Sequence, residues 1–311
     1  MLVCFALLVA PAAAQSPASS APARAASSID SAIELASKGR CEDALPLLLK
    51  YTPRVTASEI RYRALMATVR CGLHRKEDKT TANALFELKR EFPEDPEVLY
   101  MTSQVFLEIA ERASQELALV APRSYQAQEL QAETFESQGK WKEAAGIYRE
   151  ILEAHPKLRG IHYRLGRAAL SQPRSPTSLE DAKKEFELEL AIDPVNAAAE
   201  FWLGEIARRE GKWEEAIPHF AAAAKLDSNF GDALLSLGTS LNSSGRYAEA
   251  IPPLEKYVKM APQAVAGHYQ LYVAYSRVGR NEDAAREMAL HQEMREKSQA
   301  RANARSEVPP H

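Results

Sequence analysis

The chain has 311 residues, of which 46% are hydrophobic and 26% charged, a composition typical of globular proteins. Its net charge of −3 argues against nucleic-acid binding, which usually requires a strong basic excess. With only 13 glycines and 18 prolines, the composition also excludes a collagen-like or wholly disordered chain.

The N-terminus has most features of a secretory signal peptide. An uncharged apolar stretch over residues 2–10 is followed by the small residues Ala12 to Ala14, which resemble a cleavage site before Gln15. A charged first segment is absent, which leaves open a start upstream of Met1 and a lipidated N-terminus. We predict a signal peptide over 1–14, a flexible Ala/Ser/Pro leader over 15–28 and export to a bacterial periplasm or medium. The alternative is an apolar tail on a cytosolic protein.

Two cysteines, Cys41 and Cys71, remain after such cleavage. An even number of cysteines is typical of chains that enter an oxidising compartment.

A 34-residue period dominates the rest of the chain. Repeats that begin at Ala197, Gly231 and Val265 align residue by residue, and earlier ones begin at Tyr125 and Arg159. The shared positions include Leu203, Leu237 and Leu271, then Gly211, Gly245 and Gly279, then Ala216, Ala250 and Ala284. A helical bundle without internal repeats would not explain this fixed spacing.

These residues resemble the tetratricopeptide repeat (TPR) family, with its W-x2-L-G-x2-Y…A-x3-F…P pattern. The resemblance implies an all-α fold, a right-handed α-solenoid of stacked helix–turn–helix repeats. We predict about eight repeats over 29–298, clear over 125–290 and degenerate over 59–124, then a polar tail over 299–311. Within the degenerate part, 59–95 has an insertion and 96–124 a deletion. Because no repeat buries its apolar face alone, we expect a single cooperative array.

Small residues stand where the two helices of a repeat would approach most closely. Gly204 and Ala216 take repeat positions 8 and 20, and Gly238 and Ala250 do so in the next repeat. Large side chains at position 24, such as Phe220, would fill the space between helices. We therefore expect Gly204→Leu to cost roughly 1–3 kcal/mol by overpacking.

In this register Cys41 begins the second helix of the first repeat, and Cys71 lies near the end of the first helix of the second repeat. Those helix ends would lie on the same edge of the stack. We predict a disulfide between Cys41 and Cys71, with two separate buried thiols as the alternative.

No sequence motif for catalysis, metal binding or nucleotide binding is present. The histidines do not form a group with metal-ligand spacing; His162 and His268 share repeat position 4, where packing is the expected role. We therefore predict a protein that is not an enzyme, with no catalytic, metal-binding or cofactor-binding residues and no cofactor.

The resemblance implies a concave groove for a peptide or partner helix, lined by the first helix of each repeat at positions 2, 5, 9 and 12. The groove residues that we predict from this register are Tyr100, Glu133, Tyr163, Arg167, Phe201, Glu205, Arg208, Thr239, Asn242 and Tyr269. The alternative is that the aromatic rings pack against neighbouring helices. Position 5 is aromatic or aliphatic where we assigned it, so a Lys/Asn/Arg carboxylate clamp is not expected.

The sequence thus predicts a protein-interaction module, an adaptor or assembly scaffold whose partner is a protein or peptide. A structural subunit or spacer of an envelope complex, in contact through its convex face or ends, is one alternative. An accessory subunit of an enzyme is another. No nucleic-acid partner and no membrane span after signal cleavage are expected.

Overall fold

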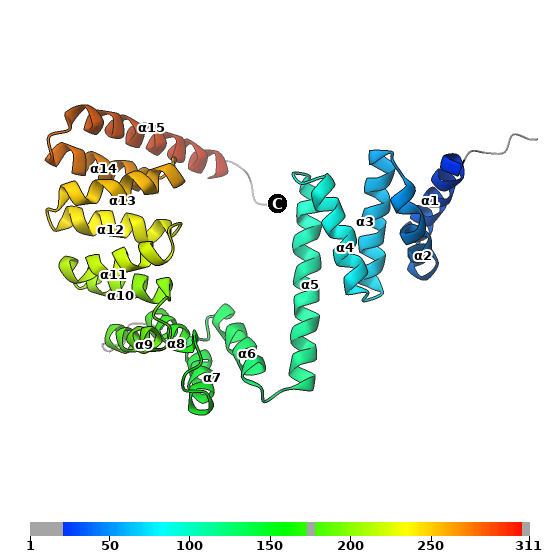
Figure 1. The fold of residues 1–311 in the computed structure, drawn as a ribbon, viewed down its shortest axis with the longest axis horizontal. Coiled ribbons are helices and arrows are strands. Elements are labelled where there is room, and N and C mark those ends of the chain that lie inside the picture. The colour runs from blue at the N-terminus through cyan, green and yellow to red at the C-terminus, as the bar shows by residue number, and fades with distance from the viewer. Residues whose placement is uncertain (1–20, 173–177, 307–311) are drawn as a thin grey trace, which may run out of the picture. The chain divides into compact units, whose positions relative to one another are not determined.

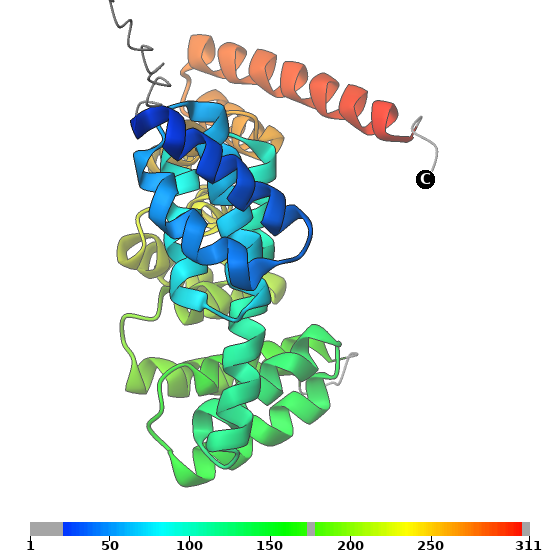
Figure 2. The ribbon, with the colours of Figure 1, turned by 90° about the vertical axis from the view of Figure 1, so that its right-hand side faces the viewer.

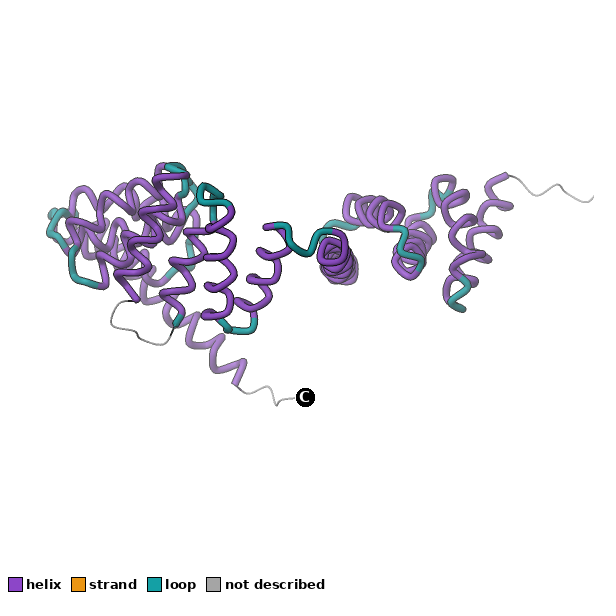
Figure 3. The backbone as a smooth tube through the Cα atoms, turned by 90° about the horizontal axis from the view of Figure 1, so that it is seen from below, coloured by secondary structure: helices purple, strands orange, loops and turns teal. Residues whose placement is uncertain are grey.

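The computed structural model describes residues 21–172 and 178–306, so the predicted signal peptide lies outside the described residues (Figure 1). The described part consists of helices and their connections, with no strand (Figure 3). A short 3-10 helix (Thr52–Arg54) follows the second α-helix. In chain order the α-helices are α1 (Ala21–Ser37), α2 (Cys41–Tyr51), α3 (Ser58–His74), α4 (Asp78–Glu91), α5 (Pro96–Val120), α6 (Tyr125–Ser137), α7 (Trp141–Ala154), α8 (Ile161–Ser171), α9 (Ser178–Ile192), α10 (Ala197–Arg209), α11 (Trp213–Leu226), α12 (Gly231–Ser243), α13 (Tyr247–Met260), α14 (Val265–Arg277) and α15 (Asn281–Ser306).

The helices form two compact units, Met1–Val120 and Ala121–His311. Within each unit, successive helices pack as pairs, and each pair packs on the next. The first helices of neighbouring pairs, α1 with α3 and α12 with α14, also contact each other, whereas the second helices approach one another less closely. Each unit therefore has a first-helix face on the inner side of its stack, as expected for an all-α TPR solenoid.

A residue in the left-handed conformation ends the first helix of most pairs. The backbone φ is +75° at Gly211 and +76° at Gly245, a region that favours glycine. In the second pair the same role falls to Lys76, whose φ is +58°. The turn position read from the sequence is therefore confirmed where glycine occupies it, and a lysine replaces glycine in the degenerate part.

The predicted close approach of the two helices is present in the clear repeats. A Cβ atom added to Gly204 would lie 2.7 Å from Cε1 of Phe220, and one added to Gly166 would lie 2.6 Å from Cε1 of Phe186. Both phenylalanines are fully buried. The glycine side of the first helix thus forms the slot that receives the large side chain of the second helix.

Glu189 of α9 is a fully buried carboxylate that caps the start of α8. Its Oε1 accepts a hydrogen bond from the backbone N–H of Gly160 at 2.7 Å, and its Oε2 accepts one from Tyr163 at 3.2 Å. Gly160 directly precedes α8 and Tyr163 lies in its first turn, where the helix itself provides no acceptor for these N–H groups. A negative charge is also favoured at this end of the helix dipole.

We expect Glu189→Ala to lower the free energy of unfolding by about 2 kcal/mol, because two N–H groups lose a charged acceptor. Denaturant unfolding followed by tryptophan emission measures this loss. Glu187→Ala on the exposed side of the same helix serves as the matched control and should change stability little. Equal losses in the two variants would show that the cap contributes nothing specific.

Helix α5 differs from the predicted helical pair over 96–124. Pro96–Val120 is one continuous helix, so the prediction of a helix–turn–helix repeat there is wrong. The physical reason is that the deletion removes the turn: no glycine or proline interrupts residues 97–121. The expected single array likewise divides into two units, with the boundary after α5.

The ends of the array also differ from the predicted boundaries. Helix α1 begins at Ala21, inside the predicted leader, where the alanine-rich sequence favours a helix and Pro22 occupies its first turn. At the other end, α15 continues to Ser306 and extends past the helices on which it packs (Figure 2). The predicted tail over 299–311 is therefore partly helical.

Candidate partner-binding surfaces

The first helices of the first unit enclose a hollow of about 260 Å³, which we call the α1–α3 hollow. Its floor is apolar and consists of Ile33, Met66 and Ala67, each less than 10% exposed. The polar side chains at its rim are Ser37, Tyr62, Arg63, Arg70 and Glu97.

The rim of the α1–α3 hollow is held partly by hydrogen bonds. The Tyr62 hydroxyl lies 3.1 Å from Glu97 Oε2 and 3.3 Å from Asp95 Oδ1, and its one hydrogen is shared between these two carboxylates. Burial and these carboxylates raise the pKa of Tyr62 to about 12, so the hydroxyl remains protonated at neutral pH. Arg70 donates to Glu97 Oε1 at 3.1 Å. Arg63 forms no hydrogen bond or ion pair with any residue that the structure describes.

The first-helix face of the second unit contains most of the predicted groove residues, but several of their side chains contact one another. Tyr163 is half-buried, with its ring 5.9 Å from that of Phe186. Phe201 is also half-buried, and its ring lies 4.9 Å from Phe230 and 5.7 Å from Phe220. These two rings follow the packing alternative.

The predicted polar residues mainly connect neighbouring first helices. Glu133 of α6 pairs with Arg164 of α8. Glu205 of α10 binds Arg208 in its own helix at 2.7 Å and accepts from Ser236 of α12 at 3.2 Å. Asn242 of α12 donates to Gln270 of α14, to the backbone carbonyl at 3.0 Å and to Oε1 at 2.9 Å. These contacts fix the spacing of the first helices.

Four predicted residues keep side chains available to a partner. Tyr269 of α14 is 44% exposed, and Tyr100 of α5 is 65% exposed. The side chains of Arg167 and Thr239 form no hydrogen bond within the described ranges. Tyr100 belongs to the first unit and the other three to the second, so the structure does not bring the whole predicted set together in one unit.

The sequence interpretation missed the α1–α3 hollow. Carried into the first two repeats, the register places Ile33 and Ala36 at positions 9 and 12, and Arg63 and Arg70 at positions 5 and 12. These are groove positions, but the predicted set began at Tyr100. The residues that line the hollow could therefore have been recognised from their repeat positions, even in the degenerate repeat that places an arginine, Arg63, at position 5.

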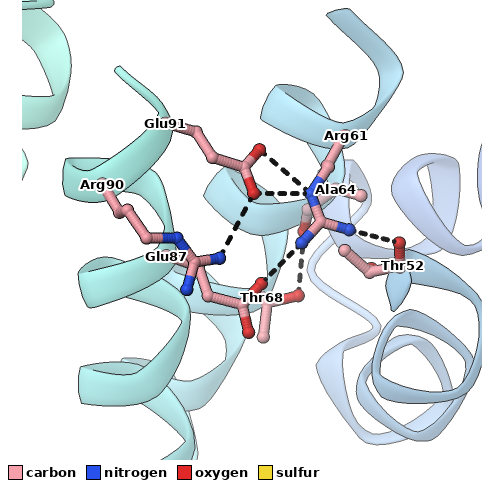
Figure 4. Close-up of polar contacts among 7 residues, drawn as sticks. All are labelled: Thr52, Arg61, Ala64, Thr68, Glu87, Arg90 and Glu91. Atoms are coloured by element: carbon pink, nitrogen blue, oxygen red, sulfur yellow. Dashed lines mark hydrogen bonds and ion pairs between the residues drawn. The ribbon is translucent and has the colours of Figure 1, made fainter. Parts of the chain in front are cut away.

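The first unit also contains an ion-pair network centred on the largely buried side chain of Arg61 (Figure 4). Arg61 of α3 donates to the carbonyl of Thr52 at 2.9 Å, to Glu91 of α4 at 2.9 Å and to Glu87 at 2.8 Å. All three guanidinium nitrogens are thereby occupied. The network connects α3, α4 and the 3-10 helix, so we assign it a structural role.

Three histidines pair with a glutamate on the other helix of the same pair. The distances from Nδ1 to the carboxylate are 2.6 Å for His162 and Glu185, 2.7 Å for His219 and Glu200, and 2.7 Å for His268 and Glu287. The expected packing role of His162 and His268 fits this arrangement.

The described residues contain no group of three or more His, Cys, Asp or Glu side chains that could hold a metal ion. Within the same residues, no helix is both long and apolar enough to span a membrane.

Cys41 and Cys71 form a disulfide in the structure, with their Cα atoms 5.0 Å apart. The bond joins the start of α2 to the end of α3, and both residues are buried. It therefore links the first two helical pairs next to the α1–α3 hollow.

Comparison with known proteins helps to identify the family to which this architecture belongs. A profile of the tetratricopeptide repeat matches residues 106–159, 163–229 and 207–265. A search of curated protein sequences finds no match. Among solved structures, YrrB, a TPR protein with an unusual peptide-binding site, is 18% identical, with 62% of this chain and 98% of YrrB covered and a TM-score of 0.51. MamA is 22% identical, with 54% of this chain and 96% of MamA covered and a TM-score of 0.49. The repeat register, the helical pairs and the profile match agree, and the chain belongs to the tetratricopeptide repeat family.

Proposed function

We propose that this protein is a non-catalytic adaptor or assembly scaffold that holds a peptide or a partner helix along its first-helix faces. The observation that carries the proposal is the α1–α3 hollow, which is lined by groove positions and combines an apolar floor with charged side chains at its rim. Such a combination provides both affinity and orientation for a polypeptide ligand. Tyr269 and Arg167 offer further contacts in the second unit.

The packing of the first helices supports this function. Arg164 is paired with Glu129 and Glu133, and Asn242 is bonded to Gln270, so neighbouring first helices are tied together. A surface that is already fixed loses little conformational entropy when a partner binds. We therefore expect the free protein to present its binding face ready-made.

We further propose that the protein is exported from a bacterial cell, to the periplasm or beyond. The buried Cys41–Cys71 disulfide supports this location, because structural disulfides persist in oxidising compartments and are rare in the cytosol. The apolar N-terminal segment with its small-residue cleavage site supports it as well.

Affinity capture from an envelope extract tests the binding face. The bait is the chain from Gln15. A groove variant combines Arg63→Ala, Arg167→Ala and Tyr269→Ala, whereas a matched outer variant combines Leu49→Ala and Leu188→Ala on second helices α2 and α9. Circular dichroism first verifies that each variant folds.

We expect the wild type and the outer variant to retain the same partner, and the groove variant to retain several-fold less of it. Equal capture by the wild type and the groove variant, with loss in the outer variant, would instead favour a structural subunit or spacer that uses its convex face. Equal capture by all three proteins would locate the contact at the ends of the array.

A further inference from the structure

Two arginines of α3 flank the floor of the α1–α3 hollow. Arg63 and Arg70 both line it, with Met66 and Ala67 between them. They are seven residues apart, which corresponds to two helical turns and about 10 Å along the axis. Both guanidinium groups therefore lie on the same face of α3, one on each side of an apolar surface.

The two arginines are available to an anionic partner. Arg63 has no hydrogen bond or ion pair in the part of the chain that the structure describes. Arg70 pairs with Glu97 at 3.1 Å, but the two side chains are 62% and 54% exposed. An ion pair this exposed contributes little stability and can exchange for another carboxylate. Glu97 would then remain in place through its bond from Tyr62.

Two arginines on the first-helix faces of the second unit, Arg164 and Arg208, are already paired with acidic residues. Arg164 of α8 contacts Glu129, Glu133 and Glu136 of α6. Arg208 of α10 donates to both carboxylate oxygens of Glu205, at 2.9 Å and 2.7 Å. Both cations have partly buried partners, whereas in the α1–α3 hollow Arg63 is unpaired within the described residues and Arg70 has only the exposed carboxylate of Glu97 as its partner.

We propose that the α1–α3 hollow binds an acidic segment of a partner polypeptide. One aliphatic side chain of the segment rests on Ile33, Met66 and Ala67, and flanking Asp or Glu carboxylates bind Arg63 and Arg70. Guanidinium groups suit this role because they bind carboxylates through two parallel hydrogen bonds. This proposal rests on the proposed function, and specifies the chemistry of the partner at one part of the binding face.

Fluorescence polarisation with defined peptides tests the proposal on the chain from Gln15. The acidic probe is fluorescein-labelled Gly-Asp-Leu-Glu-Asp-Leu-Glu-Gly with an amidated C-terminus. Its neutral twin is Gly-Asn-Leu-Gln-Asn-Leu-Gln-Gly, which retains the leucines and removes the charges. The amidated end ensures that only side-chain carboxylates are measured.

We expect the acidic probe to bind the wild type roughly three- to tenfold more tightly than the neutral twin, which is what two exposed charge pairs allow. Arg63→Glu combined with Arg70→Glu should abolish this difference. Arg149→Glu combined with Lys259→Glu, on second helices of the other unit, makes the same change in net charge and should preserve it. Added salt should weaken binding of the acidic probe more than that of its twin.

Equal binding of the two peptides, no binding of either, or unchanged binding by the Arg63/Arg70 variant would overturn the proposal. Equal binding of both peptides that is lost in the groove variant would leave the proposed function intact and reject only the acidic partner. Conversely, acidic binding that depends on Arg63 and Arg70, with cellular capture unaffected by the groove variant, would reject the proposed function alone.

Discussion

Removal of the Cys41–Cys71 disulfide should lower the free energy of unfolding of the first unit by about 3–4 kcal/mol. The bond closes a loop with a sequence separation of 30, and opening it releases that restriction on the unfolded chain. Cys41→Ala combined with Cys71→Ala makes the change without placing a hydroxyl in the buried site.

Two optical signals separate the effect on the first unit from the rest of the chain. The tryptophans, Trp141, Trp202 and Trp213, all lie in the second unit. In urea, circular dichroism of the variant should lose part of its helical signal earlier, while the tryptophan midpoint stays where it is in the wild type. Thiol counting on the unreduced, unfolded chain from Gln15 provides the control, and two reactive thiols would show that the bond does not form.

Gly204→Leu should lower the free energy of unfolding by about 1–3 kcal/mol. In thermal unfolding followed by tryptophan emission, we expect a lower midpoint than in the wild type. The first carbon of any side chain at this position would lie 2.7 Å from the ring of Phe220. Because Phe220 is fully buried, its ring has no open space into which to move. An unchanged midpoint would mean that the repeat register is wrong.

Alanine substitutions at two helical glycines, Gly146 and Gly204, offer a matched comparison. Gly146 lies within α7, and a Cβ atom there would meet nothing within 4 Å. Gly146→Ala should therefore stabilise the protein by about 0.5–1 kcal/mol through helix propensity alone. Gly204→Ala should destabilise it, and shifts in the same direction for both variants would argue against the contact with Phe220.

The helical pairs over 125–290 could be predicted because the turn and the helix crossing each select a recognisable residue type at a fixed position of the repeat. The turn requires a left-handed residue, as at Gly211, and the helix crossing requires a small one, as at Gly204. Helix α5 could not be predicted in the same way. A repeat period predicts only the position at which a turn should occur. When the turn is lost, no particular residue type marks its absence.

The groove was harder to predict than the fold because exposure depends on residues about one repeat away. Phe201 and Tyr269 share repeat position 5, yet Phe230 covers the first ring at 4.9 Å, whereas the second ring is 44% exposed. Glu205 is buried through its bonds to Arg208 and Ser236, although its position alone suggested an open groove residue. Arg63 was missed because its repeat is degenerate.

The continuous helix α5 has a consequence for how the chain tolerates sequence change. Its buried residues are Val98 and Val105, both in the first half, whereas Leu119 and Val120 near its end are 83% and 77% exposed. The last contact of α5 with α4 is the ion pair of Arg112 with Asp78, so helicity over residues 113–120 must come from the intrinsic preferences of alanine, leucine, glutamate and glutamine rather than from a neighbouring helix. Selection on this stretch would act on composition, so many sequences would serve equally well there. The stacked pairs, in contrast, restrict the residue type position by position.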